Sequence, residues 1–291
     1  MQKINPFLWF NDNAVDAANV YTSAFKNAKT VSTMPGQAPT LGGKPMGVTV
    51  ELAGTTFILF NGGPQYHPNP SISFYAMCET EEEVETLWST LSKDGKIMME
   101  MNAYPWSEKY GWTEDKFGVS WQIGLTRRTS RVVPTLMYNG AQQGKAEEAV
   151  KFYVSQFPSS SIDHVARYEP DEEGPTGQIK HAGFKLNDQI FAAMDSGHPM
   201  DVPFTPGISL FINCDTQEEV DRLWDKLGEG GRYDRCGWLQ DKYGVSWQII
   251  PTLLGKLMGD KDPKRAGNVM QAMLGMNKID MKGLEEAYHK S

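Results

Sequence analysis

The chain has 291 residues with 36 acidic and 28 basic side chains, and its net charge of −8 comes without a basic cluster. This charge excludes an obvious nucleic-acid partner or an anionic membrane surface. No run of about 18 apolar residues is present to span a membrane, and the N-terminus lacks the apolar core of a signal peptide. The three cysteines are an odd, sparse count that favours a reducing cytoplasm.

Residues 6–63 predict a strand, a helix and three further strands. The apolar run 6–10 is a strand, and 14–25 keeps its apolar residues on one helical face. The segment 30–34 is predicted to be an edge strand. Residues 47–63 alternate on both sides of Gly54, which is typical of a hairpin.

Residues 72–125 predict the same order of elements. The strand 72–78 leads to a helix that begins after Thr80, has Glu83 three positions later, and ends near Gly95. A strand at 96–101 is followed by a loop. Two last strands, 110–115 and 118–125, complete a second strand–helix–three-strand module.

The sequence repeats itself. "DKFGVSWQIGL" (Asp115–Leu125) returns as "DKYGVSWQIIP" (Asp241–Pro251), and "ISFYAMCETEEEVETLWSTL" (72–91) returns as "ISLFINCDTQEEVDRLWDKL" (208–227). Matched blocks in one order indicate a tandem duplication. We therefore predict domains at 1–126 and 131–252, with two modules in each. The first half carries an insertion after Lys96 that the second half lacks.

Residues 253–291 have no counterpart in the first half. Their apolar residues recur at helical spacing, and Pro263 stands where a helix can begin. We predict a helical C-terminal extension that docks on the body. A helix that binds a partner is the alternative.

Side chains of the repeated strand alternate between two faces. Val119, Trp121 and Ile123 share the face that helices must cover, so Gln122 points to the concave side. Gln248 does the same in the second half. A buried amide needs a partner, and either a ligand or a hydrogen-bond network would supply one.

These patterns resemble the vicinal oxygen chelate superfamily, which includes glyoxalase I, bleomycin-resistance proteins and extradiol dioxygenases. The closer resemblance is to its PhnB-like branch, often labelled 3-demethylubiquinone-9 3-methyltransferase. The motifs that carry it are "PFLWFND", "ANVYTSAF", "VDRLWDKL" and "GWLQDKYGVSWQI".

The resemblance implies an α+β fold of two tandem glyoxalase-like domains, each a curved eight-stranded cup made from two βαβββ modules, with a helical tail. It also implies that cups assemble in pairs, usually through dimers. Here the two halves of one chain would form an intramolecular pseudo-dimer, and homo-oligomers stay open.

Glyoxalases of this superfamily hold a divalent metal through His or Glu on four strands. At the last strand this chain has Gln122 and Gln248, and amides are weaker ligands than carboxylates. Glu51 in the first half and His181 in the second are the remaining candidates. One ligand per cup does not make a catalytic metal site. We therefore predict no cofactor and no tightly bound metal, which leaves room for a weakly bound divalent ion.

Aromatic residues gather in the insertion of the first half, beside the predicted mouth of the cup. Aromatic walls with few polar anchors are typical of small-molecule pockets, although these side chains could instead pack on the module's edge. The predicted ligand-binding residues are Gln122, Gln248, His181, Glu51, Tyr104, Trp106 and Trp112. No catalytic residue is assigned.

Three functions are compatible with these features. We favour a cup that binds a small apolar or aromatic molecule and lacks a full metal site. A metal-dependent glyoxalase-type isomerase or lyase is the first alternative, and a structural duplicate that acts through assembly is the second. The sequence does not support the methyltransferase label, because the Gly-rich segment 228–232 follows a helix, whereas a loop that binds S-adenosylmethionine would follow a strand.

Overall fold

The computed structural model describes residues 2–35 and 44–290 and divides the chain into two compact units. One unit joins Met1–Asn5 to Ser209–Ser291, and the other is Pro6–Ile208. Each unit is described by itself below. None of the described helices is long and apolar enough to cross a membrane.

The first half contains the two predicted modules in the expected order. They are β1 (Ile4–Phe10), α1 (Ala14–Ala24), β2 (Lys29–Met34), β3 (Gly47–Leu52) and β4 (Thr55–Asn61), then β5 (Ile72–Cys78), α2 (Glu81–Leu91), β6 (Lys96–Tyr104), β7 (Ser107–Glu114) and β8 (Ser120–Leu125). The turn at Gly54 has a positive φ of 81°, as the hairpin prediction requires.

The second half repeats this order and continues into the extension. Its elements are β9 (Arg131–Tyr138), a 3₁₀ turn (Gly140–Gln142), α3 (Ala146–Gln156), β10 (Ser161–Arg167), β11 (Ile179–Leu186), β12 (Gln189–Asp195), β13 (Ile208–Cys214), α4 (Gln217–Gly228), β14 (Arg232–Tyr233), β15 (Trp238–Gln240) and β16 (Ser246–Pro251). The predicted helical tail is α5 (Thr252–Met258), α6 (Pro263–Leu274) and α7 (Met281–Tyr288), with Pro263 in the first turn of α6.

Two eight-stranded sheets confirm the predicted fold class. The first has the strand order β14-β15-β16-β13-β1-β4-β3-β2, and the second has β10-β11-β12-β9-β5-β8-β7-β6. Each sheet therefore combines two modules. In both, the first strands of the two modules lie next to one another at the centre.

The pairing of modules differs from our expectation that each half closes its own cup. The second sheet takes β5–β8 from the first half and β9–β12 from the second, with β5 antiparallel to β9. The reason is the short linker 126–130, which returns the chain beside β5 as soon as β8 ends. Consequently Gln122 shares a sheet with His181, whereas we had grouped Gln122 with Glu51 and His181 with Gln248.

A long hairpin replaces the loop that we predicted after residue 101. Strand β6 continues to Tyr104, and β7 begins at Ser107, so only a tight turn at Pro105 separates them. Several register shifts interrupt the pairing of β6 with β7. These irregularities explain why the segment lacks clear alternation in the sequence.

The repeated motif is organised by a buried carboxylate. Asp115 Oδ1 accepts hydrogen bonds from the backbone N–H of Phe117 (2.8 Å) and of Val119 (3.0 Å). Asp115 Oδ2 accepts from the hydroxyl of Tyr21 (2.7 Å) and from Nε1 of Trp121 (2.9 Å). One side chain thus ties the turn before β8 to helix α1 and to the core. Burial raises the pKa of Asp115 to about 6, against the opposing effect of these bonds.

The second copy of the motif contains the same arrangement. Asp241 accepts from the backbone N–H groups of Tyr243 (2.9 Å) and Val245 (3.0 Å), and from Nε1 of Trp247 (2.8 Å). The intervening Gly244 has φ of 90°, a conformation that strongly favours glycine. The residues that first revealed the duplication are therefore needed for the turn itself.

As the sequence predicted, Trp121 lies on the face that helices cover. Its ring packs against Tyr21 of α1 (centroids 5.2 Å apart) and against Phe25 (5.4 Å), just after that helix ends. Cys78 and Cys214 are free and buried, and burial raises the pKa of each thiol to about 12. Both thiols are therefore protonated at neutral pH, which agrees with a structural role.

Substitution Asp115→Asn should destabilise the unit Pro6–Ile208 by about 2 to 3 kcal/mol. Four N–H or O–H groups now donate to the carboxylate. In asparagine, the NH₂ group would face at least one of these donors, and that hydrogen bond would be lost. Urea unfolding followed by tryptophan fluorescence measures the loss. Lys116→Ala, an exposed neighbour in the same turn, is the control. Equal stability of Asp115→Asn and the unsubstituted chain would show that the carboxylate does not hold this turn.

Candidate functional site

The inner face of the second sheet carries the candidate site. Strand register places Tyr75 of β5 beside Gln122 of β8, and Tyr110 of β7 beside Gly124. Because side chains alternate along a strand, these residues share one face, opposite to the one that Trp121 occupies. The second sheet lies within the unit Pro6–Ile208, so these positions are fixed relative to one another.

The amide of Gln122 is fully engaged at the floor of this face. Its Nε2 donates to Ser73 Oγ (2.8 Å), and its Oε1 accepts from the hydroxyl of Tyr110 (2.8 Å). In the other unit, Gln248 Nε2 donates to Ser209 Oγ (3.0 Å) in the same way. Hydrogen bonds within the sheet thus engage both ends of the Gln122 amide and the Nε2 group of Gln248.

Four aromatic rings form a continuous cluster above this floor. Tyr104 and Trp106 stack with centroids 5.1 Å apart and an interplanar angle of 19°, and both meet the edge of Tyr110 at 5.8 and 5.7 Å. Tyr75 contacts Tyr110 at 6.0 Å. Trp106 remains 58% exposed, a large fraction for an indole. The cluster therefore offers an open aromatic surface.

Gly124 makes room for the cluster. A Cβ at this position would lie 2.6 Å from the hydroxyl oxygen of Tyr75, so any side chain here would displace the Tyr75 ring. Burial raises the pKa of Tyr75 to about 12 and raises that of Tyr110 as well. Both phenols are therefore neutral at pH 7. The predicted Trp112 lies on the same face, where its Nε1 donates to Ser120 Oγ (2.7 Å).

Two histidines lie on the same sheet at its opposite edge. His164 of β10 is opposite Gly183 of β11, and its ring fills the space that a Cβ on Gly183 would need. His164 Nε2 is 2.9 Å from Nδ1 of His181, and the rings are nearly parallel at 15°. Burial, followed by the neighbouring His164, lowers the pKa of His181 to about 4. His181 is thus a neutral imidazole at pH 7.

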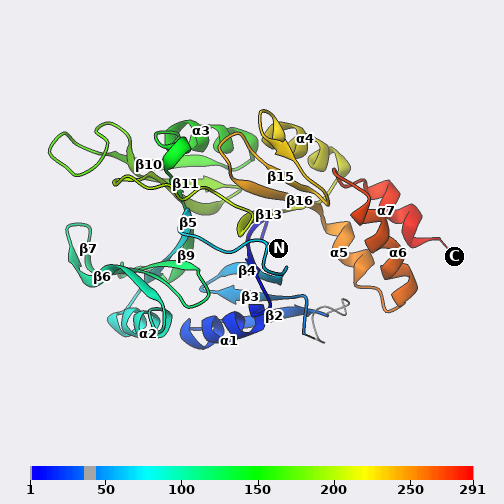
Figure 1. Ribbon diagram of the computed structural model, residues 1–291, viewed down its shortest axis with the longest axis horizontal. Helices are drawn as coiled ribbons and strands as arrows, with labels where there is room; N and C mark the ends of the chain where they lie inside the picture. Colours follow the sequence, from blue (N-terminus) through cyan, green and yellow to red (C-terminus); the bar gives the residue numbers. More distant parts are fainter. Residues whose placement is uncertain (1, 36–43, 291) are drawn as a thin grey trace. The chain divides into compact units, whose positions relative to one another are not determined.

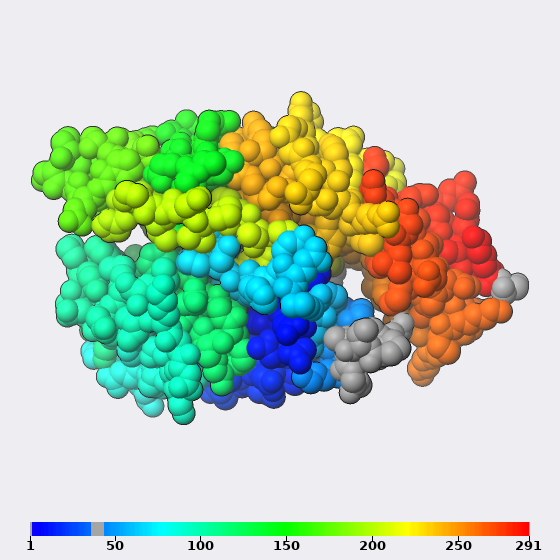
Figure 2. All heavy atoms as spheres, viewed as in Figure 1, coloured from blue at the N-terminus to red at the C-terminus, as the bar shows by residue number. Residues whose placement is uncertain are grey.

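The two edges face one another across the curve of the sheet. Figure 1 shows β10 and β11 on one side, β6 and β7 on the other, and β5 with β9 between them. The space-filling view in Figure 2 shows a narrow hollow at the left between the turquoise atoms of the β6–β7 hairpin and the green atoms above it. The aromatic cluster and the histidine pair therefore lie on the inner face of one sheet, on strands toward its opposite edges.

The other predicted residues lie apart from this cup. Glu51 is on β3 of the first sheet, where its carboxylate pairs with Lys29 (3.4 Å) on the neighbouring strand. Gln248 is on β16, in the other compact unit. The structure thus brings together Gln122, Tyr104, Trp106, Trp112 and His181 on one sheet.

Sequence reasoning missed Ser73, Tyr75 and His164. The strict alternation of "ISFYAMC" already placed Ser73 and Tyr75 on one face, so this signal was available. His164 gave no such signal, because its edge strand is exposed along its whole length and lacks an apolar period.

The donor atoms on this face do not fit a divalent metal centre. Within residues 2–35 and 44–290, no three His, Cys, Asp or Glu side chains converge on a point. Gln122 already uses both ends of its amide, and His181 directs Nδ1 at another imidazole. A catalytic ion would need at least three free donors.

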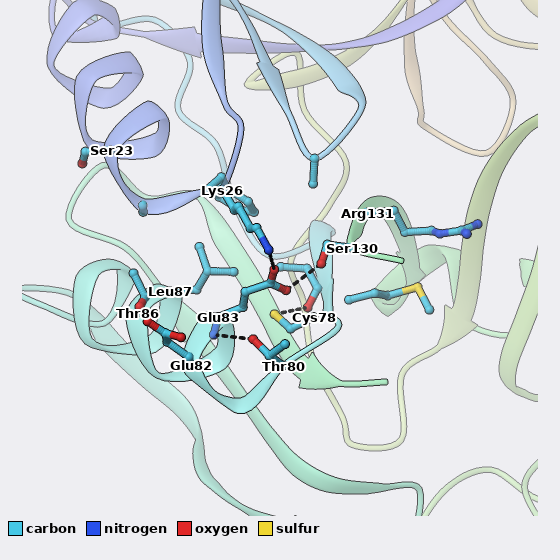
Figure 3. Close-up of a pocket in the computed structure, with 15 residues that line it drawn as sticks. Ser23, Lys26, Cys78, Thr80, Glu82, Glu83, Thr86, Leu87, Ser130 and Arg131 are labelled. Atoms are coloured by element: carbon cyan, nitrogen blue, oxygen red, sulfur yellow. Dashed lines mark hydrogen bonds and ion pairs between the residues drawn. The ribbon is translucent and has the colours of Figure 1, made fainter. Parts of the chain in front are cut away.

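A separate groove of about 350 Å³ lies between the ends of α1 and α2 (Figure 3). Its polar centre is Glu83, which accepts from Ser130 Oγ (2.6 Å) and the backbone N–H of Glu79 (2.9 Å) and lies 3.6 Å from Lys26 Nζ. The backbone N–H of Glu83 also donates to Thr80 Oγ1 (3.2 Å), which caps the helix. Both hydrogen bonds that the carboxylate accepts use Oε2, whereas Oε1 has no hydrogen-bond partner among the described residues and only the charge of Lys26 beside it. We assign this carboxylate to the start of α2.

Comparison with known proteins places the chain in a family. The family model described as 3-demethylubiquinone-9 3-methyltransferase matches twice, at residues 2–124 and 130–250. No curated protein matches the sequence. A PhnB protein from Bacillus cereus is 38% identical over 43% of this chain and 100% of its own, with a TM-score of 0.41.

Larger solved structures share the architecture. A point mutant of glyoxalase I from Zea mays aligns with 86% of this chain and 93% of its own, with a TM-score of 0.57 and 13% identity. Glyoxalase I from the same plant gives a TM-score of 0.55 and 14% identity, over 84% of this chain and 90% of its own. At such low identity these likenesses show the fold alone.

His181 should stay neutral down to about pH 4, and His164→Ala should raise its pKa, because it uncovers the buried ring and removes the neighbouring imidazole. Because the folded pKa is lower than the unfolded one, the stability from this group is present above pH 6.5 and is lost as the pH falls toward 4. NMR titration of the ring protons measures both values, with His198→Ala as the control. A His181 that titrates near 6.5 in the unsubstituted chain would contradict the assigned environment.

Proposed function

The chain belongs to the family described as 3-demethylubiquinone-9 3-methyltransferase, and within its glyoxalase-like fold we propose that it binds a small apolar or aromatic molecule in the cup of the second sheet. The observation that carries the proposal is the stacked pair of Tyr104 and Trp106 on Tyr110, with the indole 58% exposed. A planar ligand can extend this stack through offset or edge contacts between rings.

The opposite side of the cup supplies polar recognition. The neutral pair His164 and His181 has one hydrogen bond between its rings and keeps an outer nitrogen on each ring for a ligand. One aromatic wall and few convergent polar atoms are the usual composition of a small-molecule site. Which tautomer each ring adopts will depend on the ligand.

We further propose that binding proceeds without a tightly held metal or other cofactor. Support comes from the donor set, because both ends of the Gln122 amide and one nitrogen of each imidazole are already paired, which leaves one nitrogen on each ring. A weakly bound divalent ion at His181 is the competing proposal, and with it a metal-dependent isomerase or lyase.

The methyl transfer named in the family description receives no local support. The Gly-rich segment 228–232 joins the end of α4 to β14, whereas a cofactor loop would follow a parallel strand. We infer a cytoplasmic location from the free, buried thiols. We also infer that the two halves act as an internal pair, and that larger homo-oligomers are compatible with this arrangement.

Trp106→Ala should weaken binding of 2-naphthol, a neutral planar probe, about tenfold, or ~1.4 kcal/mol. The substitution removes one ring of the stack at an exposed site and should leave folding intact. Titration followed by probe fluorescence gives the affinity. Tyr233→Ala is the matched control, since Tyr233 is an exposed ring stacked on Trp224 of α4 in the other unit. Unchanged affinity in Trp106→Ala would refute the proposed wall.

Incubation with nickel, zinc or manganese, followed by dialysis, should leave far less than one ion per chain. The reason is the shortage of free donors on the inner face. Elemental analysis provides the measurement, with His198→Ala as a control for surface histidines. Stoichiometric uptake that His181→Ala abolishes would instead establish the metal-dependent alternative.

A further inference from the structure

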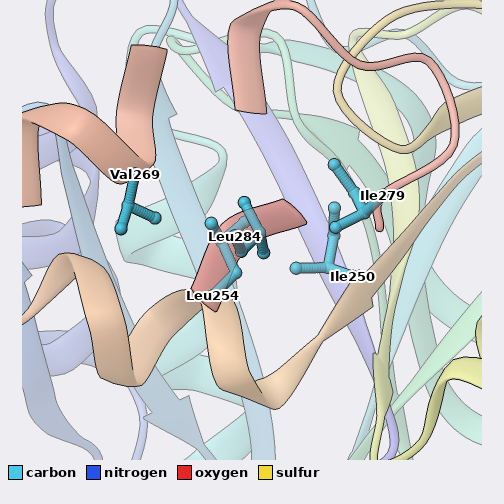
Figure 4. Close-up of a cluster of buried hydrophobic side chains, with 5 residues drawn as sticks. All are labelled: Ile250, Leu254, Val269, Ile279 and Leu284. Atoms are coloured by element: carbon cyan, nitrogen blue, oxygen red, sulfur yellow. The ribbon is translucent and has the colours of Figure 1, made fainter. Parts of the chain in front are cut away.

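The C-terminal extension covers one face of the strands β13 and β16. A buried cluster joins Ile250 of β16 to Leu254, Val269, Ile279 and Leu284 of the extension (Figure 4). Phe211 of β13 packs against the same cluster. Apolar side chains make up this contact, so the extension is firmly docked, as the sequence indicated.

The covered face is the inner one. Phe211 lies beside Gln248 in the register of β13 and β16, and Ile250 follows two positions later, so all three share a face. Gln248 is the residue that corresponds to Gln122 at the floor of the open cup. Trp247 and Ile249 point to the other side.

Backbone bonds fix the extension to the short hairpin between β14 and β15. The N–H groups of Cys236 and Gly237 donate to the carbonyls of Met276 and Asn277, both at 2.8 Å. A Cβ on Gly237 would lie 3.2 Å from Ile279, which shows how closely the chains approach. The segment 276–279 therefore runs against the hairpin almost as an added strand would.

The extension contacts α4 at the positions that correspond to those on α2 that bind the long hairpin. There, Glu85 of α2 pairs with Lys109 of β7 at 2.7 Å. The corresponding residue of α4 is Asp221, which pairs with Lys278 of the extension at 2.9 Å. One lysine thus takes the place of another on a matching helix, although the two come from unrelated parts of the sequence.

A second pair of matching positions on α2 and α4 shows the same exchange of the hairpin for the extension. Glu81 at the start of α2 lies 3.7 Å from Lys109, whereas its counterpart Gln217 holds the extension at both ends of its amide. Gln217 Nε2 donates to the carbonyl of Ile279 (3.1 Å), and its Oε1 accepts from the N–H of Met281 (2.8 Å).

The residues on the strands beneath the extension differ from their counterparts beneath the long hairpin. In the open cup, Tyr75 and Gly124 lie under the aromatic hairpin. At the matching positions Phe211 and Ile250 are wholly apolar, and they lie under the extension. Glycine would leave space for a ring there, but isoleucine fills that space against Leu254 and Ile279.

We infer that the C-terminal extension replaces the missing hairpin and occupies the ligand-facing surface of β13–β16, so that among the described residues the open cup is that of the second sheet. The class of ligand rests on the proposed function above. The covering itself rests on the contacts of Gln217, Lys278 and Ile279.

Equilibrium dialysis with 2-naphthol tests this inference through the number of sites per chain. The unsubstituted chain should bind one equivalent. Ile279→Asp places a charge in the apolar cluster and should release the extension, so that a second, weaker equivalent binds to the uncovered face. Gln217→Ala with Lys278→Ala is the milder variant, should the first fail to fold by near-ultraviolet circular dichroism. Hydrogen exchange of α7 reports release.

Each outcome decides the matter. Two equivalents in the unsubstituted chain, or a single equivalent once α7 exchanges faster, would overturn the inference. Unchanged exchange of α7 in both variants would overturn it too, because these contacts would then not hold the extension. If the unsubstituted chain binds no probe, the proposed function fails, whereas the gain of one equivalent in Ile279→Asp still measures the covering.

Discussion

The arrangement of the inner face depends on a buried carboxylate placed just before the last strand of a half. Asp115 fixes the turn through two backbone N–H groups and fixes the direction of β8 through the indole of Trp121. Once that indole points to the helices, the next residue must point the other way. The position of Gln122 on the concave side is thus a consequence of the carboxylate's bonds.

The duplication preserved this carboxylate and changed what is built around it. Asp241 repeats the bonds that Asp115 accepts from two backbone N–H groups and from an indole, and Gln248 repeats the bond of Gln122 to a serine. The hairpin next to the inner face differs between the halves. In the first half it is the long aromatic hairpin β6–β7, and in the second half it is the two very short strands β14 and β15. Because both copies keep the carboxylate and the glutamine of the last strand, the hairpin beside them can change without loss of the fold.

Much of the fold could be predicted from the sequence because its signals are local. Alternation, capping at Thr80 and the repeated turn each depend on residues close together in the chain. The partnership between modules could not be predicted in that way. Strands β5 and β9 are similar apolar runs, and nothing in either specifies its neighbour. The short linker 126–130 was the only sequence feature that bore on this choice.

The candidate site was predictable in part, because Tyr104, Trp106 and Trp112 stand out in the sequence as aromatic residues in an insertion. The histidine pair does not, because it depends on the register of two strands and on the absence of a side chain at Gly183.

The electrostatic character of the cup narrows what it can hold. The phenols of Tyr75 and Tyr110 have raised pKa values and His181 has a lowered one, so all three are uncharged at pH 7. Lys185, on the same side of β11 as His181, lies 3.6 Å from Asp163 of the neighbouring strand. Arg131 of β9 lies opposite Met77 on the same face, so the inner side of the sheet also carries a positive charge. A neutral planar molecule loses little hydration and gains the contact with Trp106, so we expect the side of the cup that carries the aromatic cluster to favour an uncharged ring.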